Sequence, residues 1–268
     1  MEVKWYGTAG ISITVADQKI VFDPFISFNE ANRFLPLEEI AACKHIFITH
    51  GHFDHLMHVP DILARGLGKV YCDEIAAGTL MKKGVPARRI EVIKPGDTIE
   101  LDDFTINILK GDHVVFDLPL IIKTLINRRM VKWAKNLGKV IKCFVKYPRG
   151  QVLIYDIMAG GRRILHMGSL GICSDEVYPD SVDLLSLPFQ GRSDIEDLAV
   201  QFVGKINPRV VFLQHFDDSF PPISNEIGTI GFQWIMADVF PDIKVIKPEY
   251  LKSYKWRNLQ SREFIGVR

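Results

Sequence analysis

Four side chains that commonly bind metal ions fall within six residues, and this feature constrains the chain more than any other. They are His50, His52, Asp54 and His55, in the run His-Gly-His-Phe-Asp-His. The run directly follows residues 45–49, a β-branched and aromatic segment typical of a buried strand. Neutral imidazoles and carboxylates are the groups that zinc-type divalent ions prefer. The pattern therefore predicts a metal site in a loop at the end of a strand.

The spacing of the cluster suggests two neighbouring ions. His50 and His52 stand two residues apart, and in extended backbone such residues point to the same side. Asp54 and His55 begin the next turn and are expected to face a second ion. The competing interpretation is a group of surface histidines without ligands, and four ligand-type residues in six positions argue against it. Two distant histidines also follow predicted strands and are further candidates: His113 and His215.

Strand-like segments bounded by Gly, Pro and Asp alternate with helical ones along the 268 residues. Strands are expected at 3–6, 11–15, 19–22, 45–49, 69–72, 90–93, 98–101, 104–109, 151–155, 163–167, 183–187, 210–213 and 244–247. Helices are expected at 59–65, 74–83, 194–205 and 227–239. This order predicts two sheets covered by helices. With no linker and no tandem repeat, a single domain over residues 1–268 is expected.

The segment Ile48–Leu56 contains the pattern T-H-x-H-x-D-H and resembles the signature of the metallo-β-lactamase superfamily. The resemblance extends over nearly the whole chain. Val21-Phe22-Asp23-Pro24 looks like the first motif, Gly111-Asp112-His113 the third, and Phe212–Phe216 the last. It implies an α/β (α+β) fold, a four-layer αββα sandwich of two mixed β-sheets flanked by helices. The layout is most similar to the branch that holds ascorbate-6-phosphate lactonase and N-acyl-phosphatidylethanolamine phospholipase D.

The resemblance also implies roles for individual residues. One ion would be held by three imidazoles: His50, His52 and His113. A second ion would be held by a carboxylate and two imidazoles: Asp54, His55 and His215. Asp23 would lie behind the ligands and orient their imidazoles. The implied cofactor is zinc, with one or two ions per chain, and manganese or ferrous iron are alternatives.

One position departs from the family pattern. The fourth motif normally has Gly-Asp, with the aspartate bridging both metals, and this chain has Gly168-Ser169 there. A hydroxyl is a poor ligand beside a carboxylate, so the second ion would bind weakly, a single ion would suffice, or a water held by Ser169 would replace the bridge. Loss of activity is a further outcome. His166, nearby, is expected to pack behind the site and not to bind metal.

The function expected from these residues is hydrolysis. Zinc lowers the pKa of a bound water to about 7, so metal-bound hydroxide would attack a phosphodiester, lactone or ester, with Asp54 as the catalytic carboxylate. Arg192 and Gln190, in the loop 188–193, are candidate substrate-binding residues, although this loop also suits a helix N-terminus. The alternatives are a mononuclear iron oxygenase on the same fold and a catalytically weakened metal-binding protein.

The segment 118–146 has eight Lys or Arg residues and no acidic one, so the remaining residues sum to −7 against a total of +1. Its apolar residues recur at three and four, which predicts a basic amphipathic helical insertion at about 116–147. Three interpretations remain: a cap packed on the core or on a second subunit, a helix on anionic lipid, or a lid that attracts a phosphorylated substrate or nucleic acid by charge.

Partners and location follow from the same composition. A small-molecule or lipid-like substrate is expected, with a homo-oligomer as an option, and near-neutral charge without an RNA-binding motif argues against nucleic acid. The four cysteines are far apart, and no signal-peptide pattern is found at the first residues. A cytoplasmic protein is therefore expected, with peripheral membrane contact through residues 118–146 as an alternative.

Overall fold

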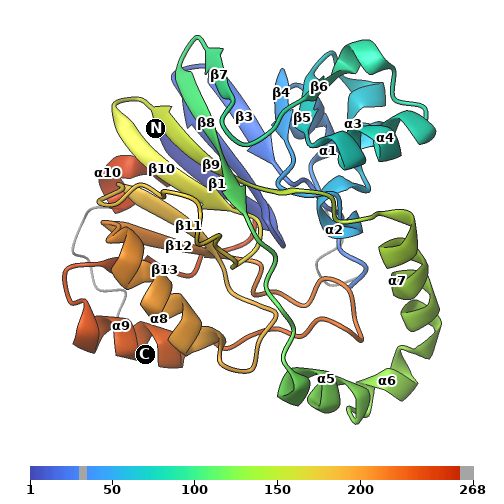
Figure 1. Cartoon of the computed structure of the whole chain (residues 1–268), viewed down its shortest axis with the longest axis vertical. Coiled ribbons are helices and arrows are strands. Elements are labelled where there is room, and N and C mark those ends of the chain that lie inside the picture. The colour runs from blue at the N-terminus through green and yellow to red at the C-terminus, as the bar shows by residue number, and fades with distance from the viewer. Residues whose placement is uncertain (30–34, 260–268) are drawn as a thin grey trace.

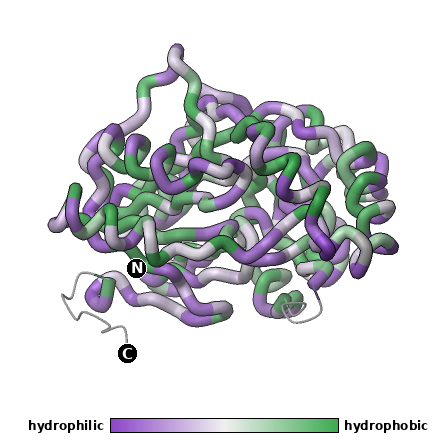
Figure 2. The backbone as a smooth tube through the Cα atoms, turned by 90° about the horizontal axis from the view of Figure 1, so that it is seen from below, coloured by the Kyte–Doolittle hydropathy of each residue, from purple (hydrophilic) through white to green (hydrophobic). Residues whose placement is uncertain are grey.

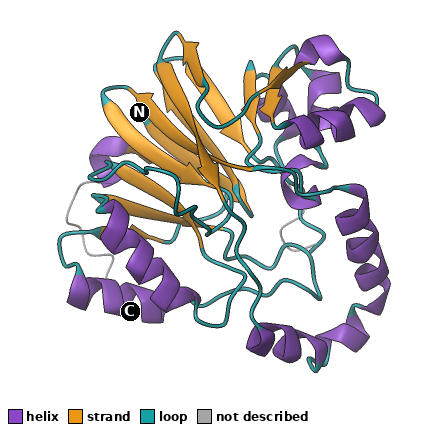
Figure 3. Cartoon of the chain, in the orientation of Figure 1, coloured by secondary structure: helices purple, strands orange, loops and turns teal. Residues whose placement is uncertain are grey.

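The computed structural model describes residues 1–29 and 35–259 and shows two seven-stranded mixed sheets packed face to face (Figures 1 and 3). The first sheet has the order β14 (Ser253–Lys255), β1 (Glu2–Gly7), β2 (Gly10–Val15), β3 (Gln18–Phe22), β4 (His45–Phe47), β5 (Lys69–Cys72) and β6 (Ile90–Val92). The second has the order β13 (Lys244–Ile246), β12 (Val210–Gln214), β11 (Leu184–Pro188), β10 (Arg162–Met167), β9 (Val152–Ala159), β8 (Phe104–Gly111) and β7 (Thr98–Leu101).

Helices cover the outer face of each sheet (Figure 3). The first sheet packs on α1 (Leu37–Ala41), α3 (Val59–Arg65) and α4 (Glu74–Lys82). The second sheet packs on α8 (Ile195–Ile206) and α9 (Ile230–Val239). Short elements complete the chain: α2 (Phe53–Leu56), a 3₁₀ turn at Ala87–Arg89, and α10 (Trp256–Leu259). The predicted sandwich of two mixed sheets flanked by helices is confirmed.

Strand direction brings the predicted site residues to one edge. β3 and β4 run parallel, with Phe22 paired to Phe47, so the residues that follow these two strands leave the sheet side by side. In the second sheet β8 and β10 are each antiparallel to β9, and β10, β11 and β12 are parallel. The ends of β8, β10 and β12 therefore point the same way. Loops from both sheets meet at this edge, as expected for α/β sites.

The core between the sheets is apolar and aromatic. Phe22, Phe47 and Tyr155 are buried there, with ring centroids 5.2 to 5.6 Å apart. Such contacts stabilise by about 0.5–1.5 kcal/mol per pair beyond the area they bury. The Tyr155 hydroxyl donates to the Ile48 carbonyl at 2.6 Å. This bond joins the second sheet to the segment that carries the ligand cluster.

Three helices follow β8 and form an arc at the periphery of the molecule (Figure 1). They are α5 (Leu118–Leu125), α6 (Arg129–Lys132) and α7 (Ala134–Lys146). Hydrophobic and hydrophilic stretches alternate along the chain in Figure 2. In the described ranges no helix is sufficiently long and apolar to cross a membrane.

Candidate metal centre

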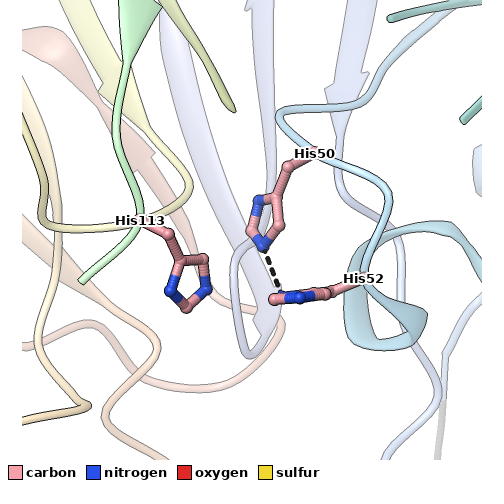
Figure 4. A group of neighbouring side chains, drawn as sticks. All are labelled: His50, His52 and His113. Atoms are coloured by element: carbon pink, nitrogen blue, oxygen red, sulfur yellow. Dashed lines mark hydrogen bonds between the residues drawn. The ribbon is translucent and has the colours of Figure 1, made fainter. Parts of the chain in front are cut away.

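The ligand loop begins where β4 ends and runs into α2. His52 has φ −59° and ψ 154°, an extended conformation that turns its side chain to the same side as that of His50. The Nε2 atom of His50 lies 3.1 Å from Nδ1 of His52 (Figure 4). His50 is buried, and His52 is partly exposed. The extended pair that the spacing predicts is therefore present.

His113 reaches the same pair from the second sheet, two residues after β8 ends. Its ring centroid lies 5.2 Å from that of His50 and 4.8 Å from that of His52 (Figure 4). The Nδ1 atom of His113 is 2.8 Å from the Val114 carbonyl, so this nitrogen carries the proton and donates. Nε2 then keeps its lone pair for a ligand. We call His50, His52 and His113 the first ligand group.

A second ligand group lies beside the first and consists of Asp54, His55 and His215. Asp54 and His55 are buried on α2, and His215 directly follows β12. The Oδ2 atom of Asp54 lies 3.2 Å from Nε2 of His215 and 3.6 Å from Nε2 of His55. The ring centroids of His50 and His55 are 3.9 Å apart, so the two groups adjoin.

Both groups fit a zinc-type ion by the chemistry of their donors. In each group one ligand atom per residue can be chosen so that all lie within 4.8 Å of one another. Two nitrogens on a tetrahedral zinc ion with bonds of about 2.0–2.1 Å stand roughly 3.3 Å apart. The 3.1 Å between His50 and His52 is close to that value. Imidazole and carboxylate donors also suit manganese and ferrous iron.

The protonation of these imidazoles also favours metal binding, because metal ligands must be deprotonated. Burial lowers the pKa of His50 well below its usual value, and the neighbouring histidines add to the effect. Burial likewise lowers the pKa of His52 to about 4 and lowers that of His113. All three are therefore neutral near pH 7, with lone pairs available. For Asp54, burial raises the pKa, but His55 and His215 outweigh it and bring the pKa below its usual value.

Asp23 lies behind the ligands, fully buried, and orients them. Its Oδ1 accepts the backbone N–H of Thr49 at 2.8 Å, and its Oδ2 accepts the Thr49 hydroxyl at 2.6 Å. The same Oδ2 lies 2.9 Å from Nδ1 of His55. That contact places the His55 proton on Nδ1 and directs Nε2 toward Asp54. Burial lowers the pKa of His55, but Asp23 and Asp54 raise it above its usual value overall.

Two of these residues adopt left-handed backbone conformations. Asp23 follows β3 with φ 44°, and His215 follows β12 with φ 57°. Such conformations cost non-glycine residues about 1–2 kcal/mol each and persist where surrounding contacts fix them. Here backbone bonds do so: Asp23 N–H donates to Phe47 O at 3.1 Å, and His215 N–H donates to Thr8 O at 2.7 Å. The sharp turn at each strand end aims the side chain into the site.

Two glycines allow the loops to approach closely. A Cβ atom on Gly168 would overlap the Thr49 side chain, and one on Gly51 would overlap the Pro148 carbonyl. The Gly51 N–H donates to the Arg149 carbonyl at 2.6 Å. Both positions therefore require glycine for close packing between loops of the two sheets.

Ser169 and His166 belong to neither ligand group. The Oγ atom of Ser169 accepts the backbone N–H of Val114 at 3.0 Å and so supports the loop that carries His113. His166 is fully buried, with Nδ1 3.0 Å from Ser186 Oγ and Nε2 4.0 Å from Asp23 Oδ2. Burial lowers the pKa of His166 to about 4. Its place behind the ligands agrees with the expectation from strand geometry.

The two predicted substrate-binding residues are engaged elsewhere in the protein. Arg192 forms a two-pronged ion pair with Asp194, at 2.6 and 2.8 Å, and also donates to the Val115 carbonyl. The side-chain amide of Gln190 donates to the Asn225 carbonyl at 2.9 Å. Arg192 therefore reaches the loop after His113, but its guanidinium already has a carboxylate partner.

Sequence reasoning overlooked Arg149. This exposed residue follows α7, and its charge contributes to the lowered pKa of both His52 and His113, after burial as the main cause. Its side chain makes no hydrogen bond or ion pair with the described residues. No sequence signal marks it, because Pro148-Arg149-Gly150 has no recognisable pattern and only the fold brings this residue to the ligands.

The chain is similar in sequence to a family model and to several curated proteins. Residues 18–216 match the model of a family described as the beta-lactamase superfamily domain, which is well over half of the chain. A UPF0173 metal-dependent hydrolase of Alkaliphilus metalliredigens is 25% identical over 84% of this chain and 88% of that protein. One of Pyrobaculum calidifontis is 37% identical, but the match covers only 38% of this chain and 46% of that relative, less than half its length.

Solved structures share the fold. Igni18, described as a novel metallo hydrolase from Ignicoccus hospitalis, aligns with a TM-score of 0.65 and 19% identity over 95% of this chain and 98% of that one. CmlA, a diiron β-hydroxylase from Streptomyces venezuelae, aligns with a TM-score of 0.60 and 13% identity over 95% of this chain and 54% of that one. At these identities the likeness concerns the fold alone, which hosts both hydrolytic and oxidative chemistry in the two neighbours.

Proposed function

The chain belongs to the metallo-β-lactamase superfamily, and on that premise we propose that it is a metal-dependent hydrolase. The observation that carries the proposal is the pair of ligand groups, each with donors within 4.8 Å, at the edge where both sheets end. The relatives named metal-dependent hydrolases agree with this activity. Zinc is the proposed ion, and a phosphodiester, lactone or ester is the proposed substrate.

The residues divide the work of the site. His50, His52 and His113 would hold one ion, and Asp54, His55 and His215 a second. When bound, a divalent ion would lower the pKa of water and stabilise the negative charge that develops on a carbonyl or phosphoryl oxygen. Asp54 keeps its negative charge because its pKa is lowered, so it can accept a hydrogen bond from a bound water or substrate and orient that group. Asp23 fixes the imidazole of His55 beside Asp54, and the Thr49 hydroxyl holds Asp23 in place.

Arg149 supplies the positive charge that favours an anionic substrate. It is exposed beside His52 and His113, and its guanidinium is not paired with any described carboxylate. A planar guanidinium binds phosphate or carboxylate with two parallel hydrogen bonds. We therefore assign substrate binding to Arg149 in place of Arg192, whose partner is Asp194.

The experiment that tests the function combines elemental analysis of the purified protein with hydrolysis of a bis-aryl phosphodiester and an aryl ester. His50→Ala and Asp54→Ala should each lower turnover by about a hundredfold or more while the fold survives. His45→Ala is the matched control, because His45 bonds to Tyr71 at 2.9 Å and lies outside both ligand groups. Wild-type turnover in either site variant would refute the proposal.

The metal content separates the remaining alternatives. Zinc or manganese with turnover supports the hydrolase, and one ion per chain would indicate that the second ligand group is weak without a bridging carboxylate at Ser169. Iron with no hydrolysis would favour oxygen chemistry. Arg149→Gln should raise KM for the phosphodiester about tenfold with a smaller change in kcat, whereas equal KM would remove Arg149 from substrate binding.

A further inference from the structure

The outward side of α5 is apolar, although it faces solvent. Leu118, Ile121, Ile122 and Ile126 recur at i, i+3, i+4 and i+8 and so share one face, and each is between 42% and 77% exposed. Leu120 and Thr124, on the opposite face of the helix, are partly buried. Val115 and Phe116, just before α5, are also exposed. Folding leaves this face uncovered, and contiguous exposed apolar surface of this kind marks an interaction site.

The outward side of α7 is cationic. Four exposed lysines lie on it at i, i+4, i+7 and i+11: Lys135, Lys139, Lys142 and Lys146. None of them forms an ion pair with a residue in the described part of the chain, and Lys139 lies over the Phe28 ring at 3.7 Å. No acidic residue occurs between 118 and 146. The stripe therefore presents uncompensated positive charge.

The inner side of α7 is packed against the protein, and α6 is tied to it by an ion pair. Val140 and Cys143 of α7 are buried in the core beneath the first sheet, and the Phe144 ring lies 5.1 Å from that of Phe53. Arg129 of α6 pairs with Asp218 in the loop after β12. We call residues 115–146 the arm. The packing of α7 holds the lysine stripe in a fixed position relative to the first sheet.

We propose that the arm docks the protein on the surface of an anionic lipid bilayer. The exposed aliphatic side chains of α5 enter the boundary between headgroups and acyl chains, and the lysines of α7 contact the anionic headgroups. Exposed aliphatic residues flanked by lysines are the combination that holds a helix at such an interface. A second copy of the chain is a poorer occupant, because symmetric pairing would bring two sets of eight cations together.

Docking would bring the bilayer close to the ligand groups, with the arm between them. Phe116, at the start of the arm, has its ring 6.1 Å from that of His113, and Phe144 has its ring 5.6 Å from that of His52. The arm thus borders the first ligand group from two sides. The docking inference does not depend on the proposed hydrolysis, since it rests on the arm alone.

The test is co-sedimentation of the full chain with vesicles of phosphatidylcholine alone or of equal parts phosphatidylcholine and phosphatidylglycerol. The protein should pellet with the anionic vesicles at low salt and be released at high salt. Lys135→Gln and Lys142→Gln should each weaken binding about fivefold, and Ile122→Ser and Ile126→Ser should each weaken it about tenfold. These side chains are exposed, so the variants should keep the wild-type melting temperature.

Matched controls use comparable residues outside the arm. Leu67→Ser and Val177→Ser remove aliphatic side chains that are 96% and 86% exposed, and Lys44→Gln and Lys94→Gln remove exposed lysines. All four should bind vesicles as the wild type does. Absence of pelleting at low salt, or equal loss in arm and control variants, would overturn the proposal. So would a concentration-dependent dimer in sedimentation velocity that Ile122→Ser dissociates, because the face would then bind a second copy.

Discussion

At the scale of single residues, Ser169 positions the loop that carries the ligand His113. Its hydroxyl accepts the N–H of Val114, the residue after the ligand His113. Ser169→Ala would leave this buried N–H without a partner, which costs about 1–3 kcal/mol. We expect a melting temperature lower by several degrees and a first ligand group that binds zinc more weakly, measured by thermal unfolding and zinc titration.

The companion variant Ser169→Asp keeps an acceptor at this position and adds the carboxylate that the family pattern has there. It should raise the number of ions bound per chain. If Ser169→Ala melts like the wild type, the contact with Val114 contributes nothing. If Ser169→Asp binds no more metal than the wild type, the position has no part in the second site.

His58 gives a prediction for pH dependence. Its Nδ1 accepts the Ile26 N–H at 3.1 Å, and burial lowers its pKa from 6.5 to about 4. Between these pH values the unfolded chain binds a proton that the folded chain does not, so the free energy of unfolding falls as pH drops from 6.5 toward 4. The loss is at most about 3 kcal/mol, and above pH 6.5 the effect vanishes.

His58→Asn tests this, because the Asn oxygen can still accept the Ile26 N–H but does not titrate. Urea unfolding between pH 7 and pH 4.5 should show a shallower loss of stability in the variant. The slope should not become flat, since the pKa of His166 is lowered to about 4 as well. Identical slopes for variant and wild type would show that His58 is not buried in its neutral form.

The ligand residues could be predicted because a short motif carries four of them, and His113 and His215 follow strands that were themselves predictable. Arg149 could not be, because only the packing of α7 against the ligand loop brings it near His52. The ion pair between Arg192 and Asp194 could not be predicted either, since charged residues in a loop have many possible partners. The left-handed backbone at Asp23 could not be predicted either, because glycine is the usual sequence sign of such a conformation and this position has none.

At the scale of secondary structure, the site depends on how closely its loops approach. Gly168→Ala would push a methyl group into Thr49, whose hydroxyl holds Asp23. We expect a loss of about 1–3 kcal/mol in stability together with weaker zinc binding. Gly78→Ala is the control, because Gly78 lies in α4 with open space around it; it should stabilise by about 0.5–1 kcal/mol. Both effects are measured by chemical unfolding.

If Gly168→Ala proved as stable as the wild type and bound zinc equally, the Thr49 loop would have to be more adaptable than its hydrogen bonds indicate. A destabilising Gly78→Ala would instead mean that α4 is more tightly packed than its open surroundings suggest. Both variants add the same methyl group, so the difference between their stabilities reflects the surroundings of the two glycines.

Most elements were predictable from local patterns, and their ends were the weakest part. The helix at 59–65 and the strands at 69–72 and 98–101 agree with the structure, whereas the strand expected at 151–155 extends to Ala159. In residues 156–159 neighbouring side chains are buried as well as alternate ones, so this part of β9 lacks the alternation that predicts a strand. β14 was missed, because Ser253–Lys255 is held as a strand by pairing with β1 and not by its own residues.

At the scale of the whole molecule, the metal ligands are divided between the sheets. His50, His52, Asp54 and His55 follow a strand of the first sheet, whereas His113 and His215 follow strands of the second. A bound ion would therefore join the two sheets. Zinc should raise the melting temperature and a chelator should lower it, with a stabilisation of about 4 kcal/mol at a thousandfold excess over Kd.

His113→Ala and His215→Ala should each remove much of this response, measured by thermal unfolding with zinc and with chelator. His45→Ala should retain it, because His45 is outside both ligand groups. A full response in His113→Ala would place the ion elsewhere. The layered architecture was predictable from the order of strands and helices, but the meeting of the ligands at one edge follows from long-range pairing that local patterns do not encode.

The pairing of β14 with β1 has a consequence for synthesis. The strand β1, Glu2–Gly7, is synthesised long before its outer neighbour, residues 253–255. Until then its edge is open, and unpaired edges are where nascent chains associate wrongly. His215 is also synthesised long after Asp54 and His55, so the second ligand group is complete only once β12 has been translated. A cell that makes this protein must therefore protect an early edge and supply metal to a late site.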